Sequence, residues 1–349
     1  MELRQILKAV LDCGGSDVFI IPGSAVTAKV NGVLKTLDDI RMKPADTEEL
    51  VRQIYALAER DMTVLEEEGD DDFSFAVREL SRFRCNAYRQ RGTMAATCRV
   101  VAFGLPDAKT MNIPSQVTDL ADLRGGMVLV TGPAGSGKST TLACMVDKIN
   151  SERSGHIVTI EDPIEYLHPH KKSLVSQREV PGDAPSFSRA IRAVLRQAPD
   201  VIMLGEMRDL DTIRTAITAA ETGHLLLSSL HTVGAAKTID RILDVFPAEQ
   251  QPQVRVQMSM VLKAVVSQRL IRTADGGLVP VFEVMTVNPA IRNMIRDGHT
   301  HQIDNAIYAG GPGMLSMDNE LTRLVRERRL DRETAILYAV NPEILAKRI

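Results

Sequence analysis

A glycine-rich segment that ends in lysine, serine and threonine carries the clearest chemistry in this sequence. The segment fits the pattern G-x-x-x-x-G-K-[S/T] and lies between an apolar run, MVLVT, and a helical pattern, TTLACMVDKIN. Glycines let successive backbone N–H groups and a helix start converge on phosphate oxygens, while Lys138 reaches the β- and γ-phosphates and Ser139 helps hold Mg²⁺. The predicted nucleotide-binding residues are Gly132, Pro133, Ala134, Gly135, Ser136, Gly137, Lys138, Ser139 and Thr140.

Carboxylates follow two other apolar runs. Glu161, Asp162 and Glu165 come after HIVTI, and Glu206 follows VIMLG. Hydrolysis needs one carboxylate that orients water and another on the metal side, and the carboxyl ends of parallel strands share one edge. We assign Glu165 as the general base and Glu206 as the metal-side carboxylate; the reverse assignment stays open, as does a solvated strand end for Glu161 and Asp162. Because Gly205 stands where the Walker B pattern has aspartate, Glu206 holds Mg²⁺ either directly or through a water.

Two histidines flank the apolar run LLLSSL. A single histidine is usually an ordinary surface or core residue, and that interpretation stays open for both. His231 falls at the expected carboxyl end of the strand, where an imidazole would sense the γ-phosphate, and His224 falls at the other end. We expect His231, and less directly His224, to take part in the reaction.

Five arginines gather in the alternating segments before residue 101. They are Arg82, Arg84, Arg89, Arg91 and Arg99. One interpretation is a solvated strand face; the other has some of them, with Arg84 and Arg99 the chosen candidates, reaching a nucleotide and neutralising charge in the transition state. The sequence leaves both interpretations open.

The hydrophobic pattern divides the chain into three parts. Residues 1–101 show alternating segments and two helical patterns, which predict a small α+β domain; 102–124 carry two prolines and scattered polar residues, as a linker does. From 125 to 349, continuous apolar runs alternate with helical patterns, so we expect a parallel sheet covered by helices on both faces, followed by C-terminal helices. The fold class is α/β.

Local signals fix some element boundaries. We expect a hairpin at Asn31-Gly32, a helix that begins with Thr47 as its N-cap, and a helix that ends at Gly298. From about residue 253, the run QVRVQMSMVLKAVVSQRLI is interpreted as helical.

Composition excludes several classes of protein. The 42 Lys and Arg against 45 Asp and Glu leave a net charge of −3, and with eight Phe, five Tyr and no Trp the chain is poorly suited to hold nucleic acid. The four cysteines form no Cys-x-x-Cys pair, which argues against a zinc ribbon. No apolar run reaches the length of a membrane span, and the first residues lack a signal-peptide core, so we expect a cytoplasmic protein.

These motifs together resemble the PilT family of type IV pilus retraction ATPases. The resemblance covers nearly the whole chain: GGSDVFI, GPAGSGKSTT, TIEDPIEY, LRQAPDVIMLGEMRDLDTI, TAAETGHLLLSSLHT and AIRNMIRDG. The last segment is typical of retraction members.

The resemblance implies a PAS-like N-terminal domain and a RecA-like P-loop ATPase domain in a homo-hexameric ring that takes nucleotide contacts from both domains. It gives the nucleotide and catalytic roles to the loop residues and to Glu165, Glu206, His224 and His231, and it aligns Arg99 with a family arginine. ATP and Mg²⁺ are the implied cofactors. Docking at the inner face of the cell membrane on a platform protein, together with a second retraction ATPase, is the implied setting.

Three alternatives stay open. The first is an ATPase that drives assembly of a pilus or secretion fibre, and the second is an accessory ring subunit that binds nucleotide with little turnover. The third, DNA translocation, is disfavoured by the net charge and the scarcity of aromatic residues.

Overall fold

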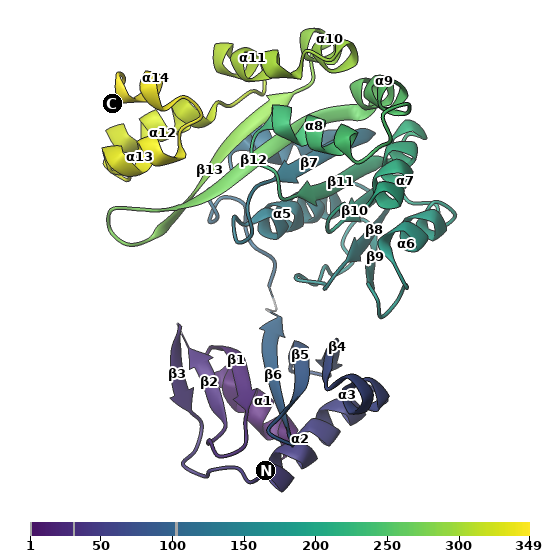
Figure 1. Cartoon of the computed structure of the whole chain (residues 1–349), viewed down its shortest axis with the longest axis vertical. Helices are drawn as coiled ribbons and strands as arrows, with labels where there is room; N and C mark the ends of the chain where they lie inside the picture. Colours follow the sequence, from purple (N-terminus) through teal and green to yellow (C-terminus); the bar gives the residue numbers. More distant parts are fainter. Residues whose placement is uncertain (1, 31, 102–103) are drawn as a thin grey trace. The chain divides into compact units, whose positions relative to one another are not determined.

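The computed structural model describes residues 2–30, 32–101 and 104–349, and it divides into two units. The first comprises Met1–Gly104 together with Glu165–Leu167, and the second comprises Leu105–Ile164 and His168–Ile349. Each unit is built on its own sheet, as the strands of Figure 1 show.

The first unit is an antiparallel sheet with helices on one face. In the described residues its strand order is β3-β2-β1-β6-β5-β4. Apolar positions alternate along the strands, so one face can pack on the amphipathic helices α1 and α2. The elements are α1 (Leu3–Asp12), β1 (Gly15–Ile20), β2 (Thr27–Val30), β3 (Val33–Thr36), α2 (Pro44–Leu57), α3 (Thr63–Glu68), β4 (Asp70–Val77), β5 (Ser81–Gln90) and β6 (Thr93–Val101).

Two local predictions in this unit have different outcomes. The expected hairpin is present, because β2 and β3 pair antiparallel with Val30 opposite Val33; Asn31 itself lies outside the described residues. Thr47 is not an N-cap, because α2 begins earlier, at Pro44, with Lys43 as its cap. Proline suits the first turn of a helix, and the Asp46 carboxylate accepts a 2.6 Å hydrogen bond from the Lys43 N–H.

The second unit contains the predicted parallel sheet. Its described strand order is β13-β12-β7-β11-β10-β8-β9, all parallel except β13. The elements up to the last parallel strand are α4 (Ser115–Thr118), η1 (Asp119–Asp122), β7 (Gly126–Thr131), α5 (Lys138–Glu152), β8 (His156–Glu161), β9 (Leu174–Glu179), α6 (Phe187–Val194), β10 (Val201–Leu204), α7 (Leu210–Glu221), β11 (Leu225–Leu230), α8 (Ala235–Asp244), α9 (Gln251–Val261) and β12 (Leu262–Arg272).

One stretch of this unit contradicts the sequence interpretation. The run from residue 253 is helical only as far as Val261, where α9 ends, and Leu262 begins the strand β12. This strand is almost entirely buried, so its apolar residues are continuous, and continuous apolar residues fit a helix as well as a strand. The β-branched pair Val265-Val266 is the local signal that favours the strand.

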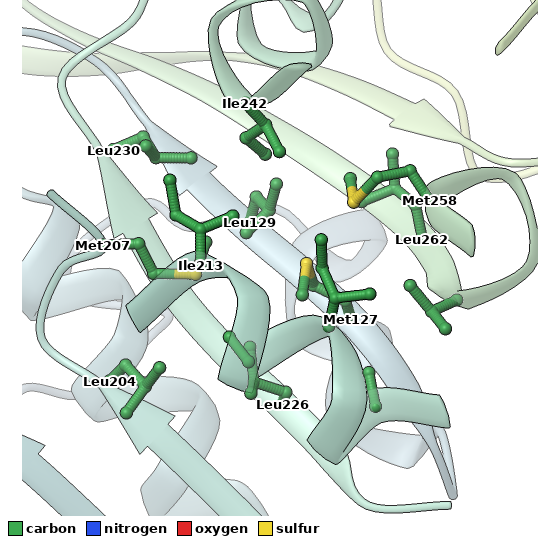
Figure 2. Packing of buried hydrophobic residues seen from close by; sticks show 14 of the residues in the cluster. Met127, Leu129, Leu204, Met207, Ile213, Leu226, Leu230, Ile242, Met258 and Leu262 are labelled. Carbon is green, nitrogen blue, oxygen red and sulfur yellow. The ribbon is translucent and has the colours of Figure 1, made fainter. Parts of the chain in front are cut away.

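Helices cover both faces of the parallel sheet. One face packs on α6 to α11, and Figure 2 shows its core with Met127, Leu129 and Ile242 among the labelled residues. The other face packs on α5 and on the segment that contains α4 and η1. Strands covered in this way are apolar on both sides, as the continuous runs predict.

The region expected to be a linker is partly built into this second face. Residues 102–103 lie outside the described residues, and from Leu105 onward the chain belongs to the second unit. Val117 and Ala121 are fully buried and pack beneath α5. Their burial explains why α4 and η1 are ordered parts of the second unit.

The chain ends in helices that extend this unit. They follow β13 (Leu278–Thr286) and are α10 (Pro289–Asp297), η2 (Thr300–Gln302), α11 (Ile303–Ala309), α12 (Met317–Arg326), α13 (Arg332–Tyr338) and α14 (Pro342–Ala346). Gly298 ends α10 with φ +80°, as predicted. The last three helices form a small core of their own with the outer part of the β12–β13 hairpin. Among the described residues, no helix combines the length and the apolar character that a bilayer span requires.

Candidate active site

The predicted phosphate-binding loop joins β7 to α5, and its backbone requires glycine. Gly132 has φ +148°, and a Cβ placed there would lie 2.2 Å from the carbonyl oxygen of Gln268 on β12. Gly137, with φ +89°, is the N-cap of α5. The loop therefore ends at a helix N-terminus with its backbone pressed against β12, which is the arrangement that binds phosphate.

Lys138 lies folded onto this loop. The residue is 8% exposed, and its Nζ donates to the carbonyl oxygens of Gly132 and Pro133 at 3.0 Å each. Ser139 and Thr140 follow it, half-buried, in the first turn of α5, while Pro133, Ala134 and Gly135 are exposed. Ser136 is buried, and its Oγ has no hydrogen-bond partner among the described residues. The nine predicted residues thus form the loop that follows β7 and the first turn of α5.

Glu206, Arg208 and His231 gather beside the loop. The Glu206 carboxylate contacts the Arg208 guanidinium through Oε1, and its Oε2 lies 3.4 Å from Nε2 of His231. His231 Nδ1 in turn faces Lys138 Nζ at 3.5 Å. The hydrogen bond to Glu206 raises the pKa of Arg208. The structure therefore brings Lys138, Glu206 and His231 together, as predicted from three separate strand ends.

A cavity of about 450 Å³ opens next to this cluster. Glu206, Arg208 and Arg241 provide its charged wall, and His231 also lines it. Neighbouring strands hold this wall in place, because Ser229 Oγ donates to the Gly205 carbonyl oxygen at 2.7 Å. Charged side chains thus face a space adjacent to the loop that binds phosphate.

His224 lies at the opposite end of β11. Its Nδ1 is 2.9 Å from the Ala219 carbonyl oxygen and 3.1 Å from Thr222 Oγ1. A six-residue strand separates it from His231, a span of about 20 Å. Within the second unit, His224 is thus not brought to the phosphate-binding loop.

The acidic residues at the end of β8 and in the segment that follows it differ in their surroundings. Glu161 is buried and accepts hydrogen bonds from Thr159 Oγ1 at 2.6 Å and from Gln177 Nε2 at 3.2 Å. Asp162 and Glu165 are exposed, and Glu165 belongs to the short segment that groups with the first unit. Of these three, Glu161 is thus a buried strand-end residue, whereas Glu165 presents its carboxylate to solvent.

Arg84 and Arg99 lie on β5 and β6 of the first unit, directly opposite each other, and are called the arginine row below. Arg99 Nε donates to Asp17 Oδ1 at 2.8 Å, and Arg84 contacts Asp72 at 3.1 Å. Burial of Asp17 opposes its ionisation, but hydrogen bonds from Ser16 and Arg99 outweigh that effect and lower its pKa. Both guanidinium groups remain well exposed.

Two residues of the site were missed by sequence reasoning. Gln268 accepts a 2.7 Å hydrogen bond from Thr141 of α5, and its backbone touches the loop at Gly132. It was missed because β12 was interpreted as helix. Arg208, the partner of Glu206, lies only two residues beyond it in the segment GEMRD, and that proximity was the available signal.

Comparisons with known proteins agree with this architecture. The family described as "Type II/IV secretion system protein" matches residues 2–329. The chain is 43% identical over 345 residues to the "Type IV pilus retractation ATPase PilT" of Pseudomonas aeruginosa, covering 98% of this chain and 99% of that protein. It is 42% identical over 320 residues to a "Twitching motility protein" of Neisseria gonorrhoeae, covering 91% and 85% of the two chains.

Solved structures give the same result for the fold. The crystal structure of the pilus retraction motor PilT with bound ADP superposes with a TM-score of 0.92 at 43% identity, covering 99% of each chain. The Legionella pneumophila ATPase DotB follows with a TM-score of 0.84 at 26% identity, covering 99% and 96%. The predicted fold class, a PAS-like α+β domain followed by a RecA-like P-loop ATPase domain with C-terminal helices, is confirmed. The chain therefore belongs to the type II/IV secretion system protein family, and within that family to the pilus retraction ATPases.

Proposed function

We propose that this chain is a cytoplasmic ATPase that powers retraction of a type IV pilus and hence twitching motility. The observation that carries the proposal is the meeting of Lys138, His231 and Glu206 at one sheet edge, in a chain 43% identical to a retraction ATPase. ATP would lie on the loop from Gly132 to Thr140. There, Lys138 would exchange its bonds to loop carbonyls for bonds to phosphate oxygens.

The donors beside the loop fit a magnesium ion. Ser139 offers a hydroxyl and Glu206 a carboxylate, both hard oxygen ligands, and Glu206 Oε2 is buried with the 3.4 Å contact to His231 Nε2 but no hydrogen bond among the described residues. In this proposal these two residues hold Mg²⁺, which neutralises charge on phosphate oxygens when bound. Few protein ligands are expected for Mg²⁺ on a nucleotide, because phosphates and water supply the rest.

The remaining roles follow from the positions of the side chains. Glu165 would orient the attacking water, with Glu206 as the candidate for the reverse assignment. His231 would respond to loss of the γ-phosphate, because it already faces Lys138 and Glu206. Arg84 and Arg99 would neutralise transition-state charge, while His224 would act indirectly from the far end of β11.

The motor would work as a homo-hexameric ring docked at the inner face of the cell membrane. Its partners would be the platform protein of the pilus machinery and a second retraction ATPase; nucleic acid is not among them. Retraction also distinguishes this proposal from fibre assembly. Cells that lack the protein should keep long fibres and lose twitching, whereas loss of fibres would overturn the retraction assignment.

Phosphate release tests the hydrolysis step. Lys138→Ala and Glu165→Gln should each lower steady-state turnover at least about 100-fold, because one loses phosphate binding and the other loses orientation of the water. Glu327→Gln, an exposed change at the residue that follows α12, serves as the charge-matched control and should keep parental turnover. Near-parental turnover in both site variants would contradict the proposal.

A further inference from the structure

A row of residues crosses the second sheet just beneath the nucleotide edge. Strand register places Leu230 of β11, Thr131 of β7, Ser267 of β12 and Glu283 of β13 side by side. The next residues along two of these strands are His231 and Gly132 of the candidate site. The three polar members of the row are all buried, at 0%, 2% and 5% exposure for Thr131, Ser267 and Glu283 respectively.

This row holds the start of α8. Gly234, the N-cap of α8, has no side chain to cap the helix, and its N–H donates to Ser267 Oγ at 2.7 Å. The backbone N–H of the next residue, Ala235, faces the Glu283 carboxylate and acts to lower the pKa of that group. Thr131 Oγ1 fixes the Ser267 hydroxyl at 3.0 Å. Ser267 of β12 thus supplies a hydrogen bond to the start of α8, and Glu283 lies next to Ser267 on the neighbouring strand.

The capped segment carries His231. Three residues separate that histidine from Ala235, and His231 contacts both Lys138 and Glu206. An anion at a helix N-terminus is favoured by the helix dipole, and the cap fixes where the helix begins. His231 thus lies in the short segment between the end of β11 and the start of α8, and both ends of that segment are held by the sheet.

Glu283 differs from an ordinary cap because its burial is costly. Its Oε1 has no hydrogen-bond partner among the described residues. Burial and the nearby Asp304 and Asp318 outweigh Ala235 and Arg269 and raise the pKa of Glu283 to about 7. Because its ordinary pKa is 4.5, the ionised group lowers the stability of the folded protein progressively from about pH 4.5 to pH 7, and fully above that.

We propose that Glu283 is a positioning residue for ATP hydrolysis, which caps α8 from β13 and thereby fixes the loop that carries His231. The proposal rests on the proposed function, since it concerns the same reaction. A residue with a purely structural role should stabilise the fold, whereas Glu283 destabilises the fold when ionised and still holds this helix. Stability and turnover should therefore respond in opposite directions when its charge is removed.

The test is Glu283→Gln, which keeps the size of the side chain and removes its charge. Turnover should fall by about 3- to 10-fold, the loss expected for one charged cap contact, with the KM for ATP unchanged. The melting temperature at pH 8 should rise, and its excess over the parent should shrink towards pH 5, where the parental carboxylate takes up its proton. The other charged groups near this site are present in both the parent and the variant, so they do not alter the comparison. They are Lys237 and Asp240 of α8 together with Arg269, Asp304 and Asp318.

A matched control removes the charge from an ordinary cap. Asp331 caps α13 by accepting the Thr334 N–H at 2.7 Å, and hydrogen bonds from Thr334 lower its pKa. Asp331→Asn should keep turnover and should not raise the melting temperature at pH 8. Glu283→Leu, which removes the acceptor as well, should lose more turnover than Glu283→Gln.

The possible outcomes separate the proposals. Unchanged turnover in Glu283→Gln, or turnover that falls together with the melting temperature, would overturn the positioning role and leave the proposed function intact. A parent protein that hydrolyses no ATP would overturn both.

Discussion

The nucleotide edge of the second unit and the arginine row of the first hold their charged groups in opposite ways. At the nucleotide edge, Lys138 is buried and Glu206 is largely covered, and backbone carbonyls and neighbouring strands fix them. In the arginine row, Arg99 is 70% exposed and pairs with a single carboxylate. Exposed ion pairs contribute little to stability, so the row can exchange partners at small cost, whereas the nucleotide edge is preorganised.

The largest effect is expected from a substitution that distorts the preorganised backbone of the phosphate-binding loop. Gly132→Ala places a Cβ 2.2 Å from the Gln268 carbonyl oxygen at φ +148°. We expect a loss of about 3 kcal/mol or more in the free energy of unfolding, and loss of ADP binding, because the added Cβ meets a backbone atom of a strand rather than the movable end of a side chain. Urea unfolding and fluorescence titration with a labelled ADP measure the two effects.

Gly135→Ala provides the matched control for that substitution. Gly135 also has a positive φ, +75°, but nothing lies within 4 Å of the added Cβ. Its cost should be limited to backbone strain of about 1–2 kcal/mol. Equal losses in the two variants would show that the close approach of β12 does not matter.

A smaller effect should follow from cutting the link between β12 and α5. Gln268→Leu leaves the buried Thr141 hydroxyl without its 2.7 Å partner, and such a group costs about 1–3 kcal/mol. Adding Thr141→Val removes the stranded hydroxyl, so the double variant should recover part of the loss. The free energies of unfolding of the two single variants and the double variant measure the coupling, and purely additive losses would contradict it.

The smallest effect should come from the arginine row. Asp17→Asn should change the free energy of unfolding by less than about 1 kcal/mol at pH 7. Because the pKa of Asp17 is lowered below 3.8, its contribution is complete above that pH and is lost as the pH falls through the lowered value. As the pH is lowered into the acid range, the free energy of unfolding of the variant should therefore fall less than that of the parent.

Arg99→Ala completes the comparison between the two regions. We expect turnover to fall at least about 10-fold while the melting temperature changes little, since Arg99 is 70% exposed and the buried Asp17 keeps its hydrogen bond from Ser16. Parental turnover would assign the arginine row to a solvated strand face.

The parts of this architecture that could be predicted are those whose sequence pattern is compatible with few structures. The glycines and lysine of the loop permit few other arrangements, and continuous apolar runs predict strands covered on both faces, as found in β7, β10 and β11. The strand β12 was not predictable by periodicity, because a fully buried strand and a buried helix share the same apolar composition.

Contacts that depend on the register between strands could not be predicted from the sequence. Gln268 and Glu283 belong to no motif, and only the pairing of β12 with β7 and β13 brings them to the site. The start of α2 was misplaced for a local reason, since Pro44 and Asp46 together outweigh Thr47 as a helix start. The site residues that could not be predicted are thus the ones placed by pairing between strands that are distant in sequence.

The strand that touches the loop at Gly132 also reaches the C-terminal helices. From Gln268, β12 continues without interruption to Arg272, and Ile271 packs with α12 to α14 in their own small core. At its other end β12 follows α9 directly, since Leu262 comes immediately after Val261. Because the segment from Gln268 to Arg272 is one uninterrupted strand, we expect a displacement of β12 at the loop to be passed along it to the C-terminal helices.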